Sequence, residues 1–177
     1  MPLKSPSISV EYNDPPPLPE RVQQLRQEYY NGKTPSWYNG HIHIAFTVSF
    51  CLLSIIFSVL CINTIEPYYA LVFVACFSFT ALKEYSIHRY PLHKKNKRVE
   101  IAFYEHAGQH HGYFTHDAME AHSPKDYFRI LFQPQDIVLF IGILNVPVAV
   151  LLAFVFHKDI GILHYLAGIT YFSLYET

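Results

Sequence analysis

Seven of the eleven histidines fall between residues 88 and 122, in a polar stretch bounded by apolar runs. Five of them form two boxes, HRYPLH and HAGQHH, which contain His88, His93, His106, His110 and His111. A neutral imidazole presents one nitrogen lone pair, so clustered histidines are suitable ligands for iron, zinc or copper. The two boxes therefore predict a metal centre held by these five residues.

The spacing in the first box restricts how its histidines can converge. His88 and His93 are five residues apart, which in an α-helix rotates them by ~140° from each other. We therefore expect the helix to unwind at Pro91 if both side chains bind one metal.

The second box favours more than one metal ion. His106 and His110 are one helical turn apart and share a face, whereas His111 lies ~100° further round. Two ligands are thus expected to hold one metal while the third turns to a second. Five ligands exceed what a single tetrahedral zinc needs, and two irons need roughly twice as many. We expect additional ligands from elsewhere.

Other polar side chains near the boxes are weaker candidates. Three carboxylates are candidate ligands or hydrogen-bond partners: Glu84, Glu105 and Asp117. The simpler interpretation is that they are solvated charges. His116 and His122 follow the second box and are interpreted as loop residues in preference to partners of the ligands. The four remaining histidines are interpreted as hydrogen-bonding or snorkelling side chains: His41, His43, His157 and His164.

The elements that must position the boxes are apolar helices. The chain is 51% hydrophobic and 15% charged, and its apolar residues are concentrated in segments. Runs at 45–63 and 68–82 form a predicted hairpin of two membrane spans, because ~20 apolar residues cross the hydrocarbon layer. A third span is predicted at 137–156 and an incomplete fourth at 161–175. This pattern predicts an all-α membrane protein of about four spans, in which residues 83–136 form a histidine-rich helical region.

Two local signals refine this architecture. Asn145 and Pro147 inside the third span predict a kink at which a neighbouring helix satisfies the freed carbonyl. Residues 1–20 are rich in proline and serine and are expected to form a mobile arm, and residues 19–30 a short amphipathic helix. That helix is expected on the membrane surface or on the domain. We therefore divide the chain into an N-terminal part, 1–40, and a membrane domain, 41–177.

Charge and cysteine content exclude several classes of function. A net charge of −1 without a basic stripe argues against a nucleic-acid partner. Cys51, Cys61 and Cys76 lie in apolar runs without metal-ligand spacing, so neither disulfides nor thiolate sites are expected. Twelve of the thirteen Lys and Arg residues fall on one side of the predicted spans, with Lys158 alone opposite. The positive-inside rule then places the boxes in the cytoplasm, in an endoplasmic reticulum or bacterial inner membrane.

The order and context of the boxes resemble a known family. HRYPLH followed by HAGQHH after a transmembrane hairpin resembles the fatty acid hydroxylase/sterol desaturase superfamily of membrane oxygenases. GYFTHDAM and LFQP, which lead into the next hairpin, are similar to the same family. The resemblance covers residues 75–177. It implies that His88 and His93 are the first box, and that His106, His110 and His111 are the second.

The resemblance also implies a chemistry. The family is expected to use two non-haem iron ions, for which zinc can substitute in a purified protein, and O₂ as co-substrate. Electrons would come from a cytochrome b5-like protein or another reductase. The reaction would be hydroxylation or desaturation of a membrane lipid of fatty acyl, sphingolipid or sterol type. No catalytic residue beyond the metal ligands is implied.

Family members have further histidine boxes after their second hairpin, whereas this chain ends at Tyr175-Glu176-Thr177, which looks like the approach to the third box. We therefore expect a longer protein. A catalytically inactive paralogue and a half-site completed by a second chain are alternatives. A haem-binding electron-transfer subunit is a weaker one, with His41 or His43 pairing with His88 or His164 as axial ligands.

Overall fold

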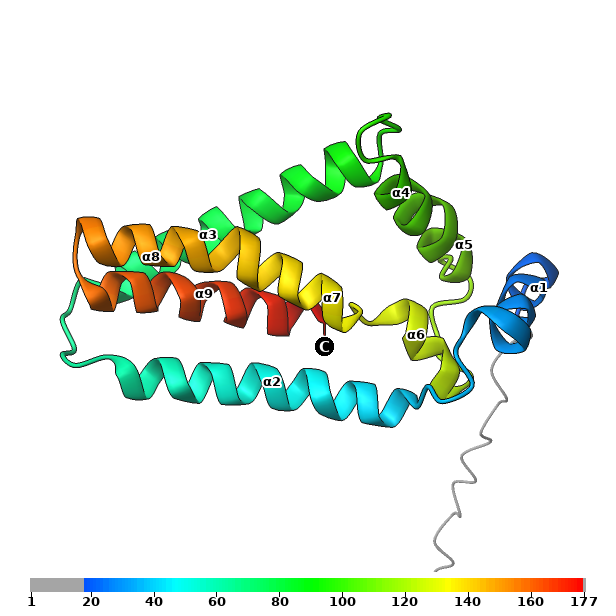
Figure 1. Cartoon of the computed structure of the whole chain (residues 1–177), viewed down its shortest axis with the longest axis horizontal. Helices are drawn as coiled ribbons and strands as arrows, with labels where there is room; N and C mark the ends of the chain where they lie inside the picture. Colours follow the sequence, from blue (N-terminus) through cyan, green and yellow to red (C-terminus); the bar gives the residue numbers. More distant parts are fainter. Residues whose placement is uncertain (1–17, 177) are drawn as a thin grey trace, which may run out of the picture.

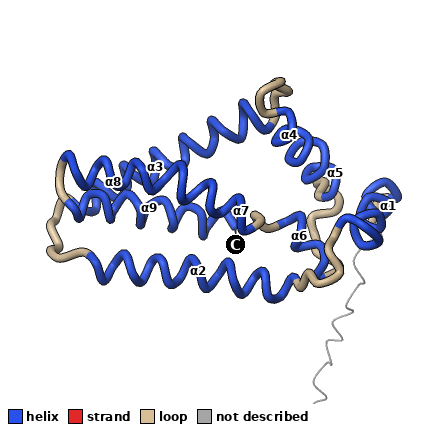
Figure 2. The backbone as a smooth tube through the Cα atoms, in the orientation of Figure 1, coloured by secondary structure: helices blue, strands red, loops and turns tan. Residues whose placement is uncertain are grey.

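The computed structural model describes residues 18–176, and within that range it contains helices and loops but no strand (Figures 1 and 2). The predicted all-α class is therefore confirmed. The predicted proline-rich arm lies almost entirely outside the described residues. Three helical stretches are long and apolar enough to cross a membrane: Gly40–Cys61, Tyr69–Leu92 and Pro124–Val155.

The first two stretches correspond to the predicted hairpin. Helix α2 is Gly40–Cys61, and helix α3 is Tyr69–Ile87, which continues into the π-helical turn η2, His88–Leu92. The Asn39 side chain begins α2 by accepting hydrogen bonds from the backbone N–H groups of His41 and Ile42. Only 6% of the apolar window of the α3 stretch is buried within the protein. Large apolar side chains therefore face outward, as expected of a span in contact with lipid.

The third stretch is built from several short helical segments. They are η4 Pro124–Asp126, α6 Tyr127–Ile130, α7 Pro134–Ile137, the π-helical η5 Val138–Asn145 and α8 Val146–Val155. The predicted irregularity at Asn145 and Pro147 coincides with the change from η5 to α8. Lys83 Nζ of α3 donates a hydrogen bond to the Leu144 carbonyl at 3.2 Å. A neighbouring helix thus reaches a carbonyl at the irregular turn, one residue beyond the Ile143 carbonyl that Pro147 leaves without an α-helical donor.

Helix α9, Lys158–Glu176, covers the residues of the predicted fourth span and is the inner helix of the bundle. It packs against α2, α3 and α8, and buries Leu163, Ala167, Ile169 and Phe172 among its side chains. Its surface faces protein, so it does not need the apolar exterior of a lipid-facing helix, and it is not among the three stretches above. Gly161 and Gly168 permit this packing, because an added Cβ would collide with Ala149 and Asn145 respectively.

The N-terminal helix packs on the histidine-rich region. Helix α1 is Glu20–Glu28 and continues as the π-helical turn η1, Tyr29–Lys33. Its Arg26 is 2% exposed and donates hydrogen bonds of 2.9 Å to the carbonyls of Ala118 and Glu120. Of the two predicted locations for this helix, the domain surface is therefore the observed one. Figure 1 shows α1 beside α5, at the end of the molecule that also carries the histidines.

Candidate metal centre

Each histidine box lies on a π-helical turn. The first is η2, His88–Leu92, which contains Pro91; the second is η3, Tyr104–His110, preceded by α4 Glu100–Phe103 and followed by α5 His111–Tyr113. A π-helix makes i→i+5 hydrogen bonds, so residues five apart come to lie nearly above one another. His88 aligns with His93 and His106 with His111 for this reason. The helix was expected to unwind at Pro91, and it widens there into this π-helical turn.

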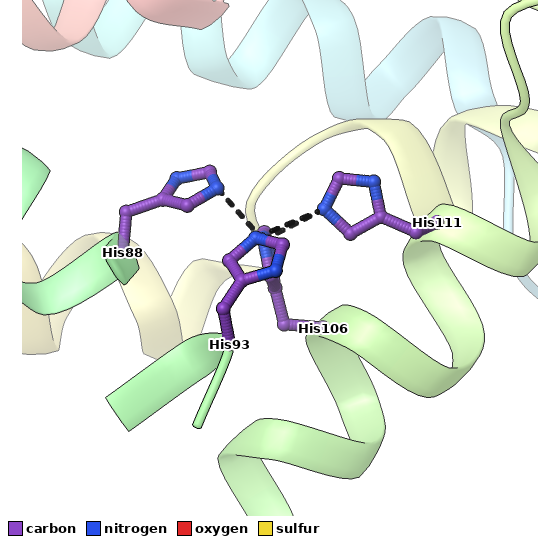
Figure 3. Close-up of side chains that lie close together, drawn as sticks. All are labelled: His88, His93, His106 and His111. Atoms are coloured by element: carbon purple, nitrogen blue, oxygen red, sulfur yellow. Dashed lines mark hydrogen bonds between the residues drawn. The ribbon is translucent and has the colours of Figure 1, made fainter. Parts of the chain in front are cut away.

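Four of the five predicted ligands converge. The ligand nitrogens of His88, His93, His106 and His111 all lie within 4.8 Å of one another, and Figure 3 shows the four rings turned toward a common point. The Nε2 atom of His106 lies 3.2 Å from that of His88 and 3.2 Å from that of His111. His111 Nε2 lies 3.3 Å from His93 Nε2.

The three separations of 3.2–3.3 Å fit neighbouring ligands of one ion. Two nitrogens bound at 2.0–2.1 Å to a tetrahedral zinc lie about 3.3 Å apart, and neighbouring nitrogens of an octahedral site about 3 Å apart. Hydrogen bonds between neutral imidazole rings explain these contacts less well than a bound ion does. A neutral imidazole nitrogen carries either one hydrogen or one lone pair, so His106 Nε2 cannot satisfy both of its nitrogen neighbours. A cation satisfies all four lone pairs at once.

Polar groups behind the ligands orient the first box. His88 Nδ1 lies 3.0 Å from Glu84 Oε1, which favours hydrogen on Nδ1 and leaves the Nε2 lone pair for a metal. The second oxygen of Glu84 accepts a hydrogen bond of 3.1 Å from the Tyr171 hydroxyl of α9. Tyr175 OH also lies 3.3 Å from His88 Nδ1. The inner helix α9 therefore supports the site from behind.

His110 stands beside the four-histidine group and outside it. Its Nδ1 lies 2.7 Å from the Arg129 carbonyl, to which it donates, so Nε2 carries the lone pair. Its ring is stacked 5.4 Å from that of His106. The expectation that His106 and His110 would share one metal while His111 turned to another is corrected here. The wider π-helical turn brings His111 Nε2 to 3.2 Å from His106 Nε2, while His110 is held by the Arg129 carbonyl.

Arg129 holds His110 in place through its own partners. Its guanidinium donates to Glu105 at 2.7 Å, to Gln109 at 2.8 Å and to the Tyr29 hydroxyl of η1 at 2.7 Å. These contacts join the second box, the third apolar stretch and the N-terminal helix. His110 is thereby fixed by residues that are as much as 100 positions apart in the sequence.

The group has a solvent side and an interior side. His93 and His111 are exposed, whereas His88 and His106 are partly buried. His88, His106 and His110 line a cavity of about 520 Å³ that continues between α3 and η5, where its wall is apolar and includes Leu139, Phe140 and Leu144. Polar side chains that include Gln133, Asp136 and Glu176 line the cavity together with these apolar ones. The cavity therefore joins the candidate metal centre to the space between α3 and η5.

Burial keeps the second-box histidines neutral. It lowers the pKa of His106 to about 3, and the neighbouring His88, His110, His111 and His93 add to that effect. Burial also lowers the pKa values of His110 and His111. A neutral imidazole is the form that binds a metal, so these side chains are prepared as ligands at neutral pH.

The weaker candidates take other positions. Glu105 pairs with Arg129, and Asp117 pairs with His116 at 2.9 Å on the exposed surface. His122 contributes its backbone N–H to Asp126. His43 has both ring nitrogens engaged, by Tyr38 OH and by the Phe132 carbonyl, while His164 is buried in α9. None of these joins the group of four described above.

Arg129 and Tyr171 had no signal in the sequence, and Tyr175 was noted only as part of the approach to a third box. All three reach the histidines because distant helices pack together. The three cysteines lie in the predicted apolar spans, Cys51 and Cys61 in α2 and Cys76 in α3.

In comparisons with known proteins, no family model, no curated protein and no solved structure matches the chain.

Proposed function

We propose that the protein is a membrane-bound, O₂-dependent oxygenase that hydroxylates or desaturates a lipid at a histidine-ligated iron centre. One observation carries the proposal. Four imidazole nitrogens converge at the polar end of apolar helices and adjoin a cavity that runs between those helices. This arrangement suits chemistry on an alkyl chain that enters from the membrane.

His88, His93, His106 and His111 would hold the first iron, and His110 is positioned to contribute to a second. The proposal of two ions rests on the resemblance of the two boxes to those of the fatty acid hydroxylase/sterol desaturase superfamily. A second ion needs ligands in addition to His110. Bound iron would supply O₂ activation. Glu84 would orient His88, while Leu139 and Phe140 would direct the alkyl chain toward the histidine end of the cavity.

The overall reaction must balance in electrons. Hydroxylation of a C–H bond by O₂ consumes two electrons and two protons and yields one alcohol and one water. Those electrons would come from a cytochrome b5-like or other reductase partner, and the exposed edges of His93 and His111 face the side from which such a partner can approach. We place that side in the cytoplasm on the distribution of Lys and Arg.

A closed zinc site is the second candidate, because three of the nitrogen separations, two of 3.2 Å and one of 3.3 Å, match those of a tetrahedral zinc. A tetrahedral zinc with four protein ligands stabilises a fold and leaves no open position for a reaction. In that case the protein would be a non-catalytic membrane component.

An isotope experiment separates the two candidates. Protein produced in full length and loaded with ferrous iron is supplied with reductase, membrane lipids and ¹⁸O₂. We expect ¹⁸O in a lipid hydroxyl group, or a new double bond, in the wild type and in the control variant His122→Ala. The variant His106→Ala should give neither. Two results together would overturn the oxygenase assignment: iron-loaded wild type modifies no lipid, and metal-free wild type binds zinc stoichiometrically in a separate titration.

A further inference from the structure

A second cavity of about 520 Å³ lies between α2, α8 and α9 and shares no lining residue with the cavity at the histidines. Its wall is apolar apart from Ser54, Ser58, Lys158 and the hydroxyl group of Tyr165. We call it the α2 groove. The small side chains of Ala149 and Ala153 and the absence of one at Gly161 let α8 and α9 pack closely.

The length of the groove matches one leaflet of a bilayer. Along α2 it is lined from Phe50 to Cys61, which at 1.5 Å per residue is about 16 Å. Half of a ~30 Å hydrocarbon core is ~15 Å. In Figure 1, α2, α8 and α9 run lengthwise side by side, so the groove follows the direction in which α2 would cross the membrane. The groove starts near the middle of α2 and ends at its C-terminus.

The lining of the groove suits a hydrocarbon chain. Most of the side chains along its length are apolar. An extended acyl chain offers no hydrogen-bonding group to such a wall and is removed from water by lying against it.

Charge at the mouth of the groove favours a phosphate. Lys158 is exposed, lines the groove, and has Asn63 Oδ1 at 3.5 Å as its hydrogen-bonding neighbour. The adjacent Asp159 is fully buried and turned toward the loop before α3, where it accepts hydrogen bonds from Thr64 and Tyr69. The ammonium group of Lys158 thus meets the headgroup region without an opposing carboxylate in the groove.

We infer that the α2 groove binds a phospholipid from the leaflet opposite the histidine centre, with one acyl chain between α2 and α8 and its phosphate at Lys158. This inference requires that α2 cross a membrane, but it does not depend on the oxygenase proposal. A lipid held there would fill the space between α2 and the α8–α9 hairpin and so fix α2 against the bundle.

Photolabelling of the unmodified protein tests the location. The protein is reconstituted in vesicles of phosphatidylcholine and phosphatidylglycerol that contain a trace phospholipid with a diazirine on its acyl chain. We expect labelled peptides to concentrate at Phe50–Cys61 and in α8. The same peptides should be labelled when the vesicles are diluted into detergent before irradiation. The inference would be overturned by equal labelling along the exposed faces of α2 and α3 that no longer occurs when dilution precedes irradiation.

Variants test the two parts of the site. Ser54→Phe narrows the groove, whereas Ser78→Phe places the same side chain on the exposed face of α3 as a matched control. Native mass spectrometry should show one retained phospholipid per chain in wild type and Ser78→Phe, and none in Ser54→Phe. Lys158→Glu should reduce retention about fivefold or more, with Lys94→Glu as its control. Unchanged retention in Ser54→Phe would contradict the proposed site.

Metal content distinguishes failure of this inference from failure of the oxygenase proposal. The groove and the histidine centre lie at different ends of α2 and α9 and share no residue. Ser54→Phe should therefore keep the metal-to-protein ratio of the wild type. Loss of both lipid and metal from this variant would indicate general unfolding, in which case the photolabelling result decides.

Discussion

His88 Nδ1 and Glu84 Oε1 lie 3.0 Å apart, one helical turn from each other at the end of α3. The contact turns the opposite nitrogen of His88 toward His106, whose Nε2 atom is 3.2 Å away. Glu84 is in turn held by Tyr171 of α9. A carboxylate that orients a ligand in this way contributes to metal affinity without touching the metal.

Substitution of Glu84 should therefore weaken metal binding while all five boxed histidines remain. We expect Glu84→Ala to raise the zinc dissociation constant about 10–100-fold, which is the usual effect of removing such a partner. Competition with a chromogenic chelator measures the constant. Glu66→Ala, a carboxylate in the loop before α3, is the control and should bind as the wild type does. Equal affinity of the two variants would show that Glu84 does not act through His88.

His110 should differ from the other boxed histidines. Since it lies outside the group of four, His110→Ala is expected to retain the first ion with an affinity within a few-fold of the wild type. His111→Ala removes a member of the group and should lower that affinity at least a hundredfold. Metal titration of the two variants under identical conditions provides the comparison. The reverse order of affinities would mean that the α-helical pairing of His106 with His110 is the real one.

The contrast between His110 and His111 shows what the sequence could and could not predict. Apolar runs predicted α2, α3 and the third stretch, because length and hydropathy are properties of a local segment. The boxes predicted which residues cluster, but an α-helical rotation of ~100° per residue assigned their partners incorrectly. The π-helical turns, the inner position of α9 and the contact of Arg129 with His110 all depend on packing between distant segments.

Stability of the metal-free protein should depend on pH through His106. Its pKa is lowered to about 3 in the folded protein, mainly by burial, against an ordinary value near 6.5 in the unfolded chain. Between these values the unfolded state binds more protons, so stability is present above pH 6.5 and falls as the pH drops toward 3. The melting temperature should decrease between pH 7 and pH 5, and less steeply in His106→Gln. If the melting temperature fell equally with pH in the two proteins, His106 would not be the source of the pH dependence.

Arg26 should hold the segment after the second box in place. Its guanidinium is buried against the carbonyls of Ala118 and Glu120 and lies 3.5 Å from Asp126. Arg26→Gln leaves these acceptors unsatisfied, so we expect a loss of about 3 kcal/mol in the free energy of unfolding. Arg21→Gln, on the exposed side of α1, should change it by less than ~0.5 kcal/mol. Chemical denaturation and limited proteolysis of residues 113–126 measure the effect, and equal stability of both variants would contradict it.

Close approach of α9 to the third stretch should make Gly168 intolerant of a side chain. An added Cβ would collide with the buried Asn145 amide, so Gly168→Ala should destabilise the protein by about 1–3 kcal/mol. Gly142→Ala is the matched control, because its nearest neighbour would be Val138 Cγ1 at 3.9 Å. Thermal unfolding in detergent compares the two. A melting temperature for Gly168→Ala equal to that of the control would show that the helices do not meet at this point.

X-ray absorption at the metal edge tests the central claim most directly, because it reports the ligands of the bound ion. Purified wild-type protein loaded with zinc or ferrous iron should bind at least one ion per chain. Its spectrum should show imidazole scattering from several nitrogens at about 2.0–2.2 Å. This signature should disappear in the double variant His106→Ala/His111→Ala and persist in His116→Ala/His122→Ala. Unchanged metal content and imidazole scattering in the first double variant would contradict a metal centre at these histidines.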